Sequence, residues 1–210
     1  MKVIGIEINH TFRNINKQLL KYYAKAFDPS MDWEEMDDRK DVFEEYLTFN
    51  DSHDKNNFIY IDYPYEIFGC AKLVDKTLNT KLNEWLHEIS EIEDEDIRVV
   101  LFSQNEGDLA IQSTYFFLSK IGCRVREMFF PRNIDEVWEK CDVVITANKN
   151  VLDSPKPDGK SVVLIRRDFN ESVAEKADLV YFELSEVFED KDFFCKCNIT
   201  EFKGNENEEG

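Results

Sequence analysis

The sequence predicts an α/β protein with an open, mainly parallel sheet between two layers of helices. One apolar run near the amino terminus and five in the second half alternate with helical patterns, and most are apolar throughout. Such runs are typical of parallel strands covered on both faces. Short helical connections favour a three-layer, Rossmann-like arrangement. The expected strands are residues 2–8, 97–103, 123–129, 142–147, 161–166 and 178–183.

Helices are expected in the connections between these strands. In the segment after the second strand, Leu109, Phe116 and Leu118 supply apolar contacts, and Gly122 follows directly. Glycine is the usual residue in the left-handed position that ends a helix. The predicted helices cover residues 79–91, 108–120, 134–140 and 171–176.

A long segment separates the first two strands. Almost ninety residues lie between them, and a connection of that length needs structure of its own. Apolar residues at helical spacing in 15–27 and in 36–47 predict a helical insertion over residues 11–75. It would interrupt an α/β core formed by residues 1–10 and 76–197. The insertion can cover the strand ends like a cap, or pack on the sheet edge and cover nothing.

The chain is strongly acidic. Its 210 residues carry 26 Lys and Arg against 44 Asp and Glu, a net charge of −18. Residues 28–62 alone hold twelve acidic and three basic residues. Because affinity for phosphate backbones comes largely from Lys and Arg, nucleic acid and anionic membranes are not expected partners. Residues 198–210 lose the apolar pattern and are expected to form an acidic, disordered tail.

Composition places the protein in the cytoplasm. The chain is 42% hydrophobic, enough to bury one core, and no apolar run approaches the roughly 20 residues that span a bilayer. The amino terminus lacks the features of a signal peptide. Five scattered cysteines do not resemble the framework of a disulfide-rich secreted domain. Cys195 and Cys197 have no further ligands nearby to complete a zinc site.

The end of the first strand carries the most informative pattern. Glu7, Asn9 and Thr11 occupy alternate positions after an apolar strand. This spacing resembles the first motif of the haloacid dehalogenase (HAD) superfamily, Asp-x-Asp-x-Thr. The resemblance implies a phosphoryl-transfer fold in which the first aspartate is the nucleophile, the second is the general acid and base, and both help to hold Mg²⁺. Here both aspartates are replaced.

The two replacements remove different parts of that chemistry. Glu7 keeps the charge but is longer by one methylene, and misplacing a reacting group by about 1 Å can cost on the order of 100-fold in rate. Asn9 cannot exchange a proton at neutral pH, and general acid–base catalysis is typically worth about 10²–10⁴-fold.

The second and third motifs are represented by single residues. Ser103 ends the second strand where the family has a hydroxyl that contacts the phosphoryl group, although an ordinary helix cap or turn is the favoured interpretation of this residue. Arg132, or Lys140 after it, stands where the family has a basic residue. Ser103 and Arg132 are therefore candidates for a weak phosphate site, whereas the ordinary interpretation of Arg132 is a solvated side chain.

The fourth motif has lost its acidic pair. The strand that ends at Thr146 and Ala147 keeps its apolar frame, but the carboxylates expected at these two positions are missing. Mg²⁺ needs oxygen ligands that usually include one or two carboxylates. Asp142 lies at the opposite end of the strand, and only Asp153 could swing back toward the site. No catalytic residue and no metal site is therefore expected.

We interpret the chain as a catalytically inactive HAD-like pseudo-phosphatase, without a cofactor, that binds a protein or serves as a structural component. Degenerate members of the superfamily also occur as structural proteins of tailed bacteriophages, so the resemblance allows a virion-associated role. The alternative is an active phosphatase or nucleotidase, in which Glu7 acts as nucleophile, Asp153 holds Mg²⁺ and a small phosphate ester is hydrolysed.

An aromatic segment in the insertion is a candidate interface. Residues 60–69 are unusually aromatic for a connection that also contains Pro and Gly. They can form core packing or an exposed patch, since aromatic residues are enriched at binding hot spots. Together with the acidic residues, such a patch would suit a partner with a basic surface. The interface candidates are Tyr60, Tyr63, Tyr65 and Phe68.

Overall fold

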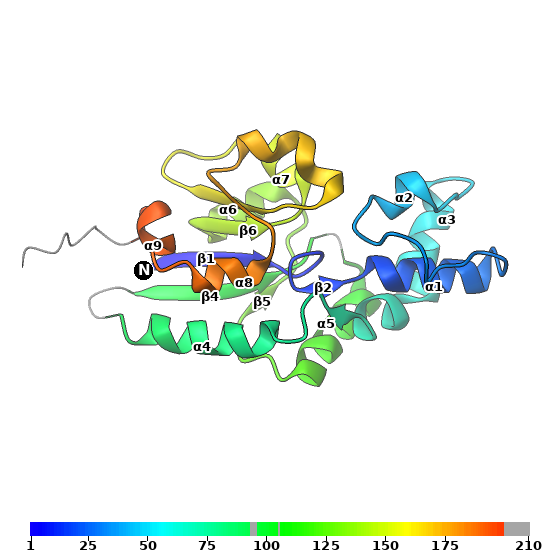
Figure 1. The fold of residues 1–210 in the computed structure, drawn as a ribbon, viewed down its shortest axis with the longest axis horizontal. Helices are drawn as coiled ribbons and strands as arrows, with labels where there is room; N and C mark the ends of the chain where they lie inside the picture. Colours follow the sequence, from blue (N-terminus) through cyan, green and yellow to red (C-terminus); the bar gives the residue numbers. More distant parts are fainter. Residues whose placement is uncertain (93–95, 105, 200–210) are drawn as a thin grey trace, which may run out of the picture.

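The computed structural model describes residues 1–92, 96–104 and 106–199, and it contains one six-stranded parallel sheet. The observed sheet, with helices on both faces (Figure 1), confirms the predicted fold class. In spatial order the strands are β5 (Met128–Phe129), β4 (Ile97–Phe102), β1 (Lys2–Glu7), β6 (Val143–Thr146), β7 (Ser161–Ile165) and β8 (Leu179–Tyr181).

The central strand β1 is the point at which the order of strand addition reverses across the sheet. From β1 the chain builds β4 and β5 on one side, and it then returns to build β6, β7 and β8 on the other. In open α/β sheets, ligands bind outside the carboxyl ends of the strands at such a switch point. Glu7, Ser103 and Thr146 all lie at or directly after these strand ends.

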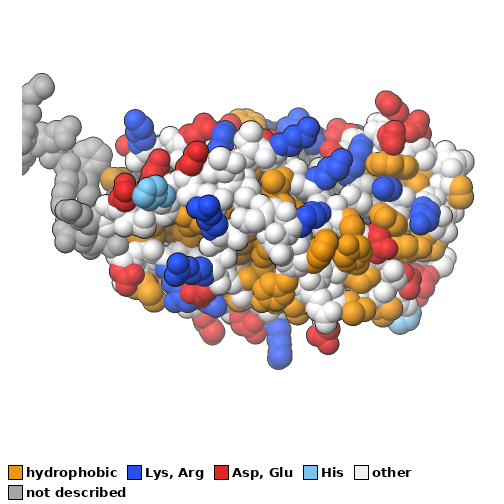
Figure 2. All heavy atoms as spheres, turned by 90° about the horizontal axis from the view of Figure 1, so that it is seen from below, with side chains coloured by type: hydrophobic (Ala, Val, Ile, Leu, Met, Phe, Trp, Pro, Cys, Tyr) orange, Lys and Arg blue, Asp and Glu red, His pale blue; other side chains and the backbone are white. Residues whose placement is uncertain are grey.

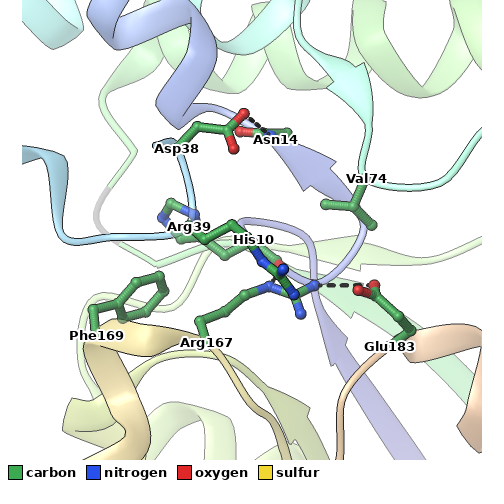
Figure 3. A pocket seen from close by; sticks show the side chains of 8 residues that line it. All are labelled: His10, Asn14, Asp38, Arg39, Val74, Arg167, Phe169 and Glu183. Atoms are coloured by element: carbon green, nitrogen blue, oxygen red, sulfur yellow. Dashed lines mark hydrogen bonds and ion pairs between the residues drawn. The ribbon is translucent and has the colours of Figure 1, made fainter. Parts of the chain in front are cut away.

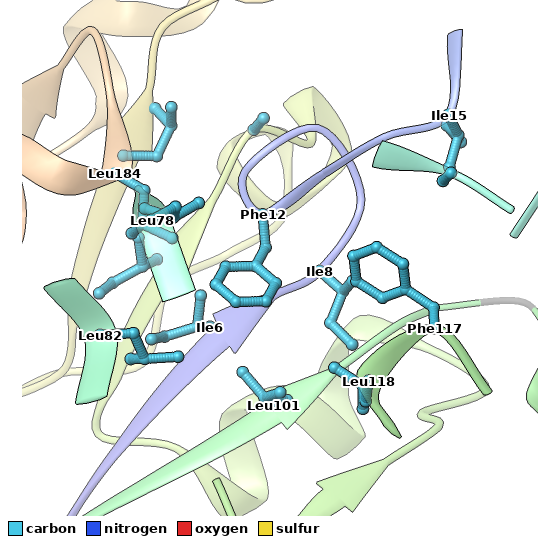
Figure 4. Close-up of a cluster of buried hydrophobic side chains, with 14 of the residues drawn as sticks. Ile6, Ile8, Phe12, Ile15, Leu78, Leu82, Leu101, Phe117, Leu118 and Leu184 are labelled. Carbon is cyan, nitrogen blue, oxygen red and sulfur yellow. The ribbon is translucent and has the colours of Figure 1, made fainter. Parts of the chain in front are cut away.

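Two hydrophobic cores fill the space between the sheet and its helices. Ile6 of β1 points into the first core (Figure 4), to which Ile4 also belongs. Val3 belongs to the second core, because neighbouring side chains of a strand face opposite sides. The first core is covered by α4 (Leu78–Ser90), α5 (Asp108–Ile121), α8 (Leu184–Glu189) and α9 (Phe193–Lys196). The second is covered by α6 (Ile134–Lys140), α7 (Lys149–Asp153) and the 3-10 helix η3 (Asp168–Lys176).

The insertion lies beyond the carboxyl end of β1 (Figure 1). It leaves the core through β2 (Arg13–Asn14) and returns through β3 (Lys72–Leu73), and these strands pair antiparallel. Its second π-helix packs on α5 and α1. The insertion therefore sits on the side expected of a cap, although its exact boundaries stay a prediction. Its helices are α1 (Asn16–Ala26), α2 (Val42–Glu45), α3 (Ser52–Asn57) and the π-helices η1 (Phe58–Asp62) and η2 (Tyr65–Gly69).

Several elements differ from the predicted ones. The strand expected over residues 123–129 is reduced to β5, because only Met128 and Phe129 pair with β4. The helix expected over 36–47 is reduced to α2. The expected tail lies outside the described residues apart from Asn198 and Ile199, and Ile199 is buried in the first core, so the ordered chain extends further than predicted.

In the described part of the chain, no helix combines the length and the apolar character needed to cross a membrane.

Close packing at Gly5 yields a first test of the fold. A Cβ atom at position 5 would lie 2.5 Å from Sγ of the buried Cys141. Gly5→Ala should therefore lower the free energy of unfolding by about 1–3 kcal/mol, the usual cost of overpacking a core. Cys141→Ala should recover part of this loss in the double variant. Chemical denaturation measures the effect. Gly107→Ala is the control, since its Cβ would meet nothing closer than 3.9 Å. Equal losses at both glycines would contradict the packing argument.

Candidate functional site

Glu7 ends the central strand, and its carboxylate is buried among neutral groups. Its side chain is 4% exposed. Oε2 accepts a hydrogen bond from the Thr146 hydroxyl, and Oε1 accepts one of 3.4 Å from Nδ2 of Asn148. Nδ2 of Asn148 also donates to Gln104 Oε1 at 2.9 Å. Burial raises the pKa of Glu7 to about 7, and the hydrogen bonds from Thr146 and Asn148 limit the rise. The carboxyl group is therefore about half protonated at neutral pH.

Asn9 uses both polar atoms of its side chain within the protein. Nδ2 donates to Ser103 Oγ at 3.1 Å, and Oδ1 accepts from Nε of Arg13 at 2.7 Å. The position that would carry a general acid in a HAD enzyme thus holds a neutral amide with both of its groups occupied.

A buried ion pair lies beside Asn9. Arg13 and Glu106 form it, with side chains 0% and 1% exposed. Oε1 of Glu106 also accepts from Ser103 Oγ at 2.6 Å, and Oε2 accepts from the Thr114 hydroxyl at 2.6 Å. Nη1 of Arg13 donates to Thr114 Oγ1 at 2.7 Å. We refer to Asn9, Arg13, Ser103, Glu106 and Thr114 as the Arg13 network.

Two rings and one carbonyl complete the surroundings of the guanidinium. Its central carbon lies 4.9 Å from the ring centroid of Phe68 and 5.7 Å from that of Phe117. Nη1 also donates to the carbonyl oxygen of Phe68 at 3.4 Å. Burial lowers the pKa of Arg13, and Glu106 opposes the decrease. Because Phe68 belongs to η2, the ion pair joins the insertion to the core.

The residues present do not fit the Mg²⁺ that the resemblance implies. The resemblance implies the carboxylate at position 7, the main-chain carbonyl at position 9 and a carboxylate after the fourth strand, and Thr146 and Ala147 do not supply the last of these. Among the described residues, no three His, Cys, Asp or Glu side chains are grouped so that they could hold a metal. Asp142 accepts from the Val3 main-chain N–H at 2.8 Å, at the amino end of the sheet. Asp153 is half exposed and pairs with Lys176 at 2.5 Å.

The structure does not bring the two expected phosphate ligands together. Ser103 is fully buried within the Arg13 network, whereas Arg132 is exposed. The main-chain N–H of Arg132 donates to Oε2 of Glu136 at 2.9 Å. Lys140 points elsewhere, with its ammonium 4.4 Å from the ring centroid of Phe129. A phosphate site on Ser103 and Arg132 would therefore require Ser103 to leave its partners.

The aromatic segment divides between core and surface. Phe68 is 2% exposed and stacks on Tyr60, so it packs inside the protein and is not available to a partner. Tyr63 is partly buried against Phe58 and Tyr22. Tyr65 is 48% exposed, and its ring centroid lies 5.1 Å from that of Phe116 on α5.

Further exposed apolar residues lie along α5 and at Ile61 of η1. We refer to the group as the apolar face; it consists of Ile61, Tyr65, Leu109, Tyr115 and Phe116. Figure 2 views the side of the molecule on which α4 and α5 lie, and it shows hydrophobic side chains gathered there among charged ones of both signs. Periodicity could not separate these residues from core positions, since Leu109 and Phe116 were expected to pack inward.

The raised pKa of Glu7 predicts a pH-dependent stability. The folded carboxyl group holds its proton up to about pH 7, whereas the unfolded group loses it near its ordinary value of 4.5. The contribution of this group to stability therefore decreases as pH rises through that window, by about 3 kcal/mol. Glu7→Gln should be more stable than the wild type at pH 8 by about that amount and similar to it near pH 4.5.

Chemical denaturation across this pH range tests the prediction, and Glu139→Gln on the surface controls for net charge. A Glu7→Gln variant that is destabilised equally at every pH would contradict the raised pKa.

The Arg13 network should be strongly coupled. Arg13→Met leaves the Glu106 carboxylate buried without its cation, and breaking a buried pair typically costs about 3–5 kcal/mol. The double variant Arg13→Met, Glu106→Met should lose less than the sum of the two single variants, because neither charge is then left alone. The exposed pair of Arg166 and Glu171 is the control, and Arg166→Met should cost less than about 1 kcal/mol. Additive losses in the double-mutant cycle would argue against a coupled pair.

Comparisons with known proteins inform the fold. No protein-family model and no curated protein matches the chain. Among solved structures, the chain is similar to a protein of Burkholderia xenovorans LB400 that is provisionally described as a haloacid dehalogenase-like hydrolase. The TM-score is 0.54 at 11% sequence identity, over 92% of this chain and 97% of the other. The likeness shows that this chain has a HAD-like fold.

Proposed function

We propose that the chain is a non-catalytic scaffold of HAD-like fold that binds a protein partner. The observation that carries the proposal is the Arg13 network. Asn9 and Ser103 stand at the positions that would serve proton transfer and phosphoryl contact, and both are bonded to the buried pair of Arg13 and Glu106. Their polar groups thus stabilise the fold and are not directed at a substrate.

Freeing these groups would be costly. A substrate phosphate that took the Ser103 hydroxyl would remove one hydrogen bond from the Glu106 carboxylate and would bring a second anion beside it. In a site of low dielectric, incompletely paired charges cost several kcal/mol. This cost supports the proposal that Ser103 and Asn9 stay bonded within the Arg13 network and do not bind a substrate.

The rival function is hydrolysis of a small phosphate ester, which the similarity to a protein described as a hydrolase favours. It requires an ionised Glu7 and a second carboxylate that holds a metal. Asp153, the second carboxylate that the rival function would need, is paired with Lys176. This pairing favours the scaffold.

The proposed contact surface combines the apolar face with the acidic insertion. Tyr65 of the insertion packs against Phe116 on α5, so the face spans the insertion and the core. Asp62, which follows Ile61, and Asp108, which precedes Leu109, are both exposed. Exposed aromatic residues supply affinity while surrounding charges steer association, and a partner with an apolar centre and basic residues around it fits this surface. Such a partner could belong to a cytoplasmic complex or to the virion of a tailed phage.

Hydrolysis assays combined with partner capture test the proposal. The purified protein with Mg²⁺ and a generic phosphate ester should show no turnover above that of Glu7→Gln. Tyr65→Ala with Phe116→Ala should reduce capture of a specific partner about tenfold or more, since hot-spot side chains are worth at least about 2 kcal/mol each. Phe182→Ala is the matched control, because it removes a ring that is 57% exposed and that follows β8, at the opposite edge of the sheet from β5.

Metal-dependent turnover that disappears in Glu7→Gln would favour the phosphatase and overturn the scaffold. Equal capture by the double variant and the wild type, with both folded, would exclude the apolar face as the contact surface.

A further inference from the structure

A pocket of about 310 Å³ lies between the insertion and the core (Figure 3). Neither Glu7 nor any member of the Arg13 network lines it. The insertion side contributes residues near β2 and α2, and the core side contributes the loops that follow β1 and β7. The charged and aromatic residues that line the pocket are His10, Asp38, Arg39, Arg167, Phe169 and Glu183.

Most charged groups of the pocket already have partners. Oδ2 of Asp38 accepts from Nδ2 of Asn14 at 2.8 Å. Arg167 pairs with Glu183 at 3.4 Å and donates to the carbonyl oxygens of His10 at 3.3 Å and Phe182 at 2.6 Å. These bonds fix Arg167 as a wall of the pocket and leave little of its donor capacity for a ligand.

Arg39 and His10 differ from these residues. The main-chain N–H of Arg39 donates to Oδ1 of Asp37 at 3.0 Å. The guanidinium of Arg39 has no hydrogen-bond or ion-pair partner among the described residues. The ring nitrogens of His10 likewise have none in that part of the chain, although the ring packs edge-on to Phe169 with centroids 5.3 Å apart. In Figure 3 both side chains lie beside the same space. Polar side chains that converge on a pocket without partners are typical of a ligand site.

The conformation and charge state of His10 fit such a role. Its φ of 64° lies in the left-handed region, which is uncommon for residues other than glycine and is enriched at functional sites. Burial, followed by the positive charges of Arg167 and Arg13, lowers the pKa of His10 to about 4. The ring is therefore neutral at physiological pH, with one nitrogen that donates and one that accepts.

We infer that this pocket binds a small organic monocarboxylate. The planar fork of Arg39 matches the two oxygens of a carboxylate, and the N–H of His10 supplies a second donor. The apolar part of the ligand would pack against the edge of Phe169. The pocket corresponds to roughly ten water volumes of about 30 Å³ each, so a ligand the size of benzoate fits with room for water.

The charges of the pocket favour a monoanion over a phosphate dianion. Its walls contain two basic residues, Arg39 and Arg167, and two acidic ones, Asp38 and Glu183. A single negative charge can pair with Arg39. A second one would meet the two carboxylates and the net charge of −18 of the whole chain without a further free cation.

Titration of the full-length protein with benzoate, acetate and inorganic phosphate tests the inference. Calorimetry gives the affinities, and the imidazole NMR signals of His10, assigned with His10→Asn, report where binding occurs. Benzoate should bind most tightly, acetate more weakly and phosphate weakest, and benzoate should shift the His10 signals. Arg39→Ala should weaken benzoate binding about tenfold or more, because hydrogen bonds to charged groups are the strong ones. Arg39→Lys, which keeps the charge but loses the fork, should lie between the two.

Arg132→Ala is the matched control, since Arg132 is also an exposed arginine near the strand ends but does not line the pocket. Its affinity for benzoate should equal that of the wild type. Tighter binding of phosphate than of benzoate would overturn the charge argument. Benzoate binding that is unchanged in Arg39→Ala, or no binding with the fold intact, would overturn the site. None of these outcomes depends on whether the protein binds a partner through the apolar face.

Discussion

The buried ion pair between Arg13 and Glu106 connects three parts of the structure that are distant in sequence. Arg13 lies on β2, Glu106 precedes α5, and the guanidinium reaches the carbonyl of Phe68 on η2. Taking two charges out of water is expensive, so the pair persists only because hydroxyl, amide and carbonyl groups satisfy the remaining donors and acceptors. The same bonds hold the insertion against the core and occupy the groups at the strand ends.

The arrangement also explains the unusual state of Glu7. The guanidinium of Arg13 is matched by Glu106, and the partners of Glu7 are the neutral side chains of Thr146 and Asn148. A buried carboxylate without a cation is disfavoured relative to its protonated form, and its pKa rises accordingly. The nearby cation, Arg13, lies four residues beyond Asn9 in the sequence and is paired with Glu106.

The frame of the fold could be predicted from the sequence, whereas the site could not. Continuous apolar runs identify β1, β4, β6 and β7, because strands buried on both faces need them. The pairing of Arg13 with Glu106 spans 93 positions, and no local pattern indicates it. The aromatic segment was ambiguous for a similar reason. The π-helix η2 buries Phe68 and exposes Tyr65, and neither strand nor α-helix periodicity describes a π-helix.

The proposed anion site depends on which arginine side chains are not already paired with an acidic residue. At the centre of the sheet, the side chain of Arg13 is fully buried and paired with Glu106, so it is not exposed to a ligand. In the pocket between the insertion and the core, Arg167 is held by main-chain carbonyls and by Glu183. These bonds fix the loop after β7, whose Phe169 packs against His10. Of the two arginines that line this pocket, Arg39 belongs to the insertion, and its guanidinium has no partner among the residues that the structure describes. Since the insertion and the core each supply one side of the pocket, a ligand there would contact both parts of the chain, as the buried ion pair of Arg13 and Glu106 does.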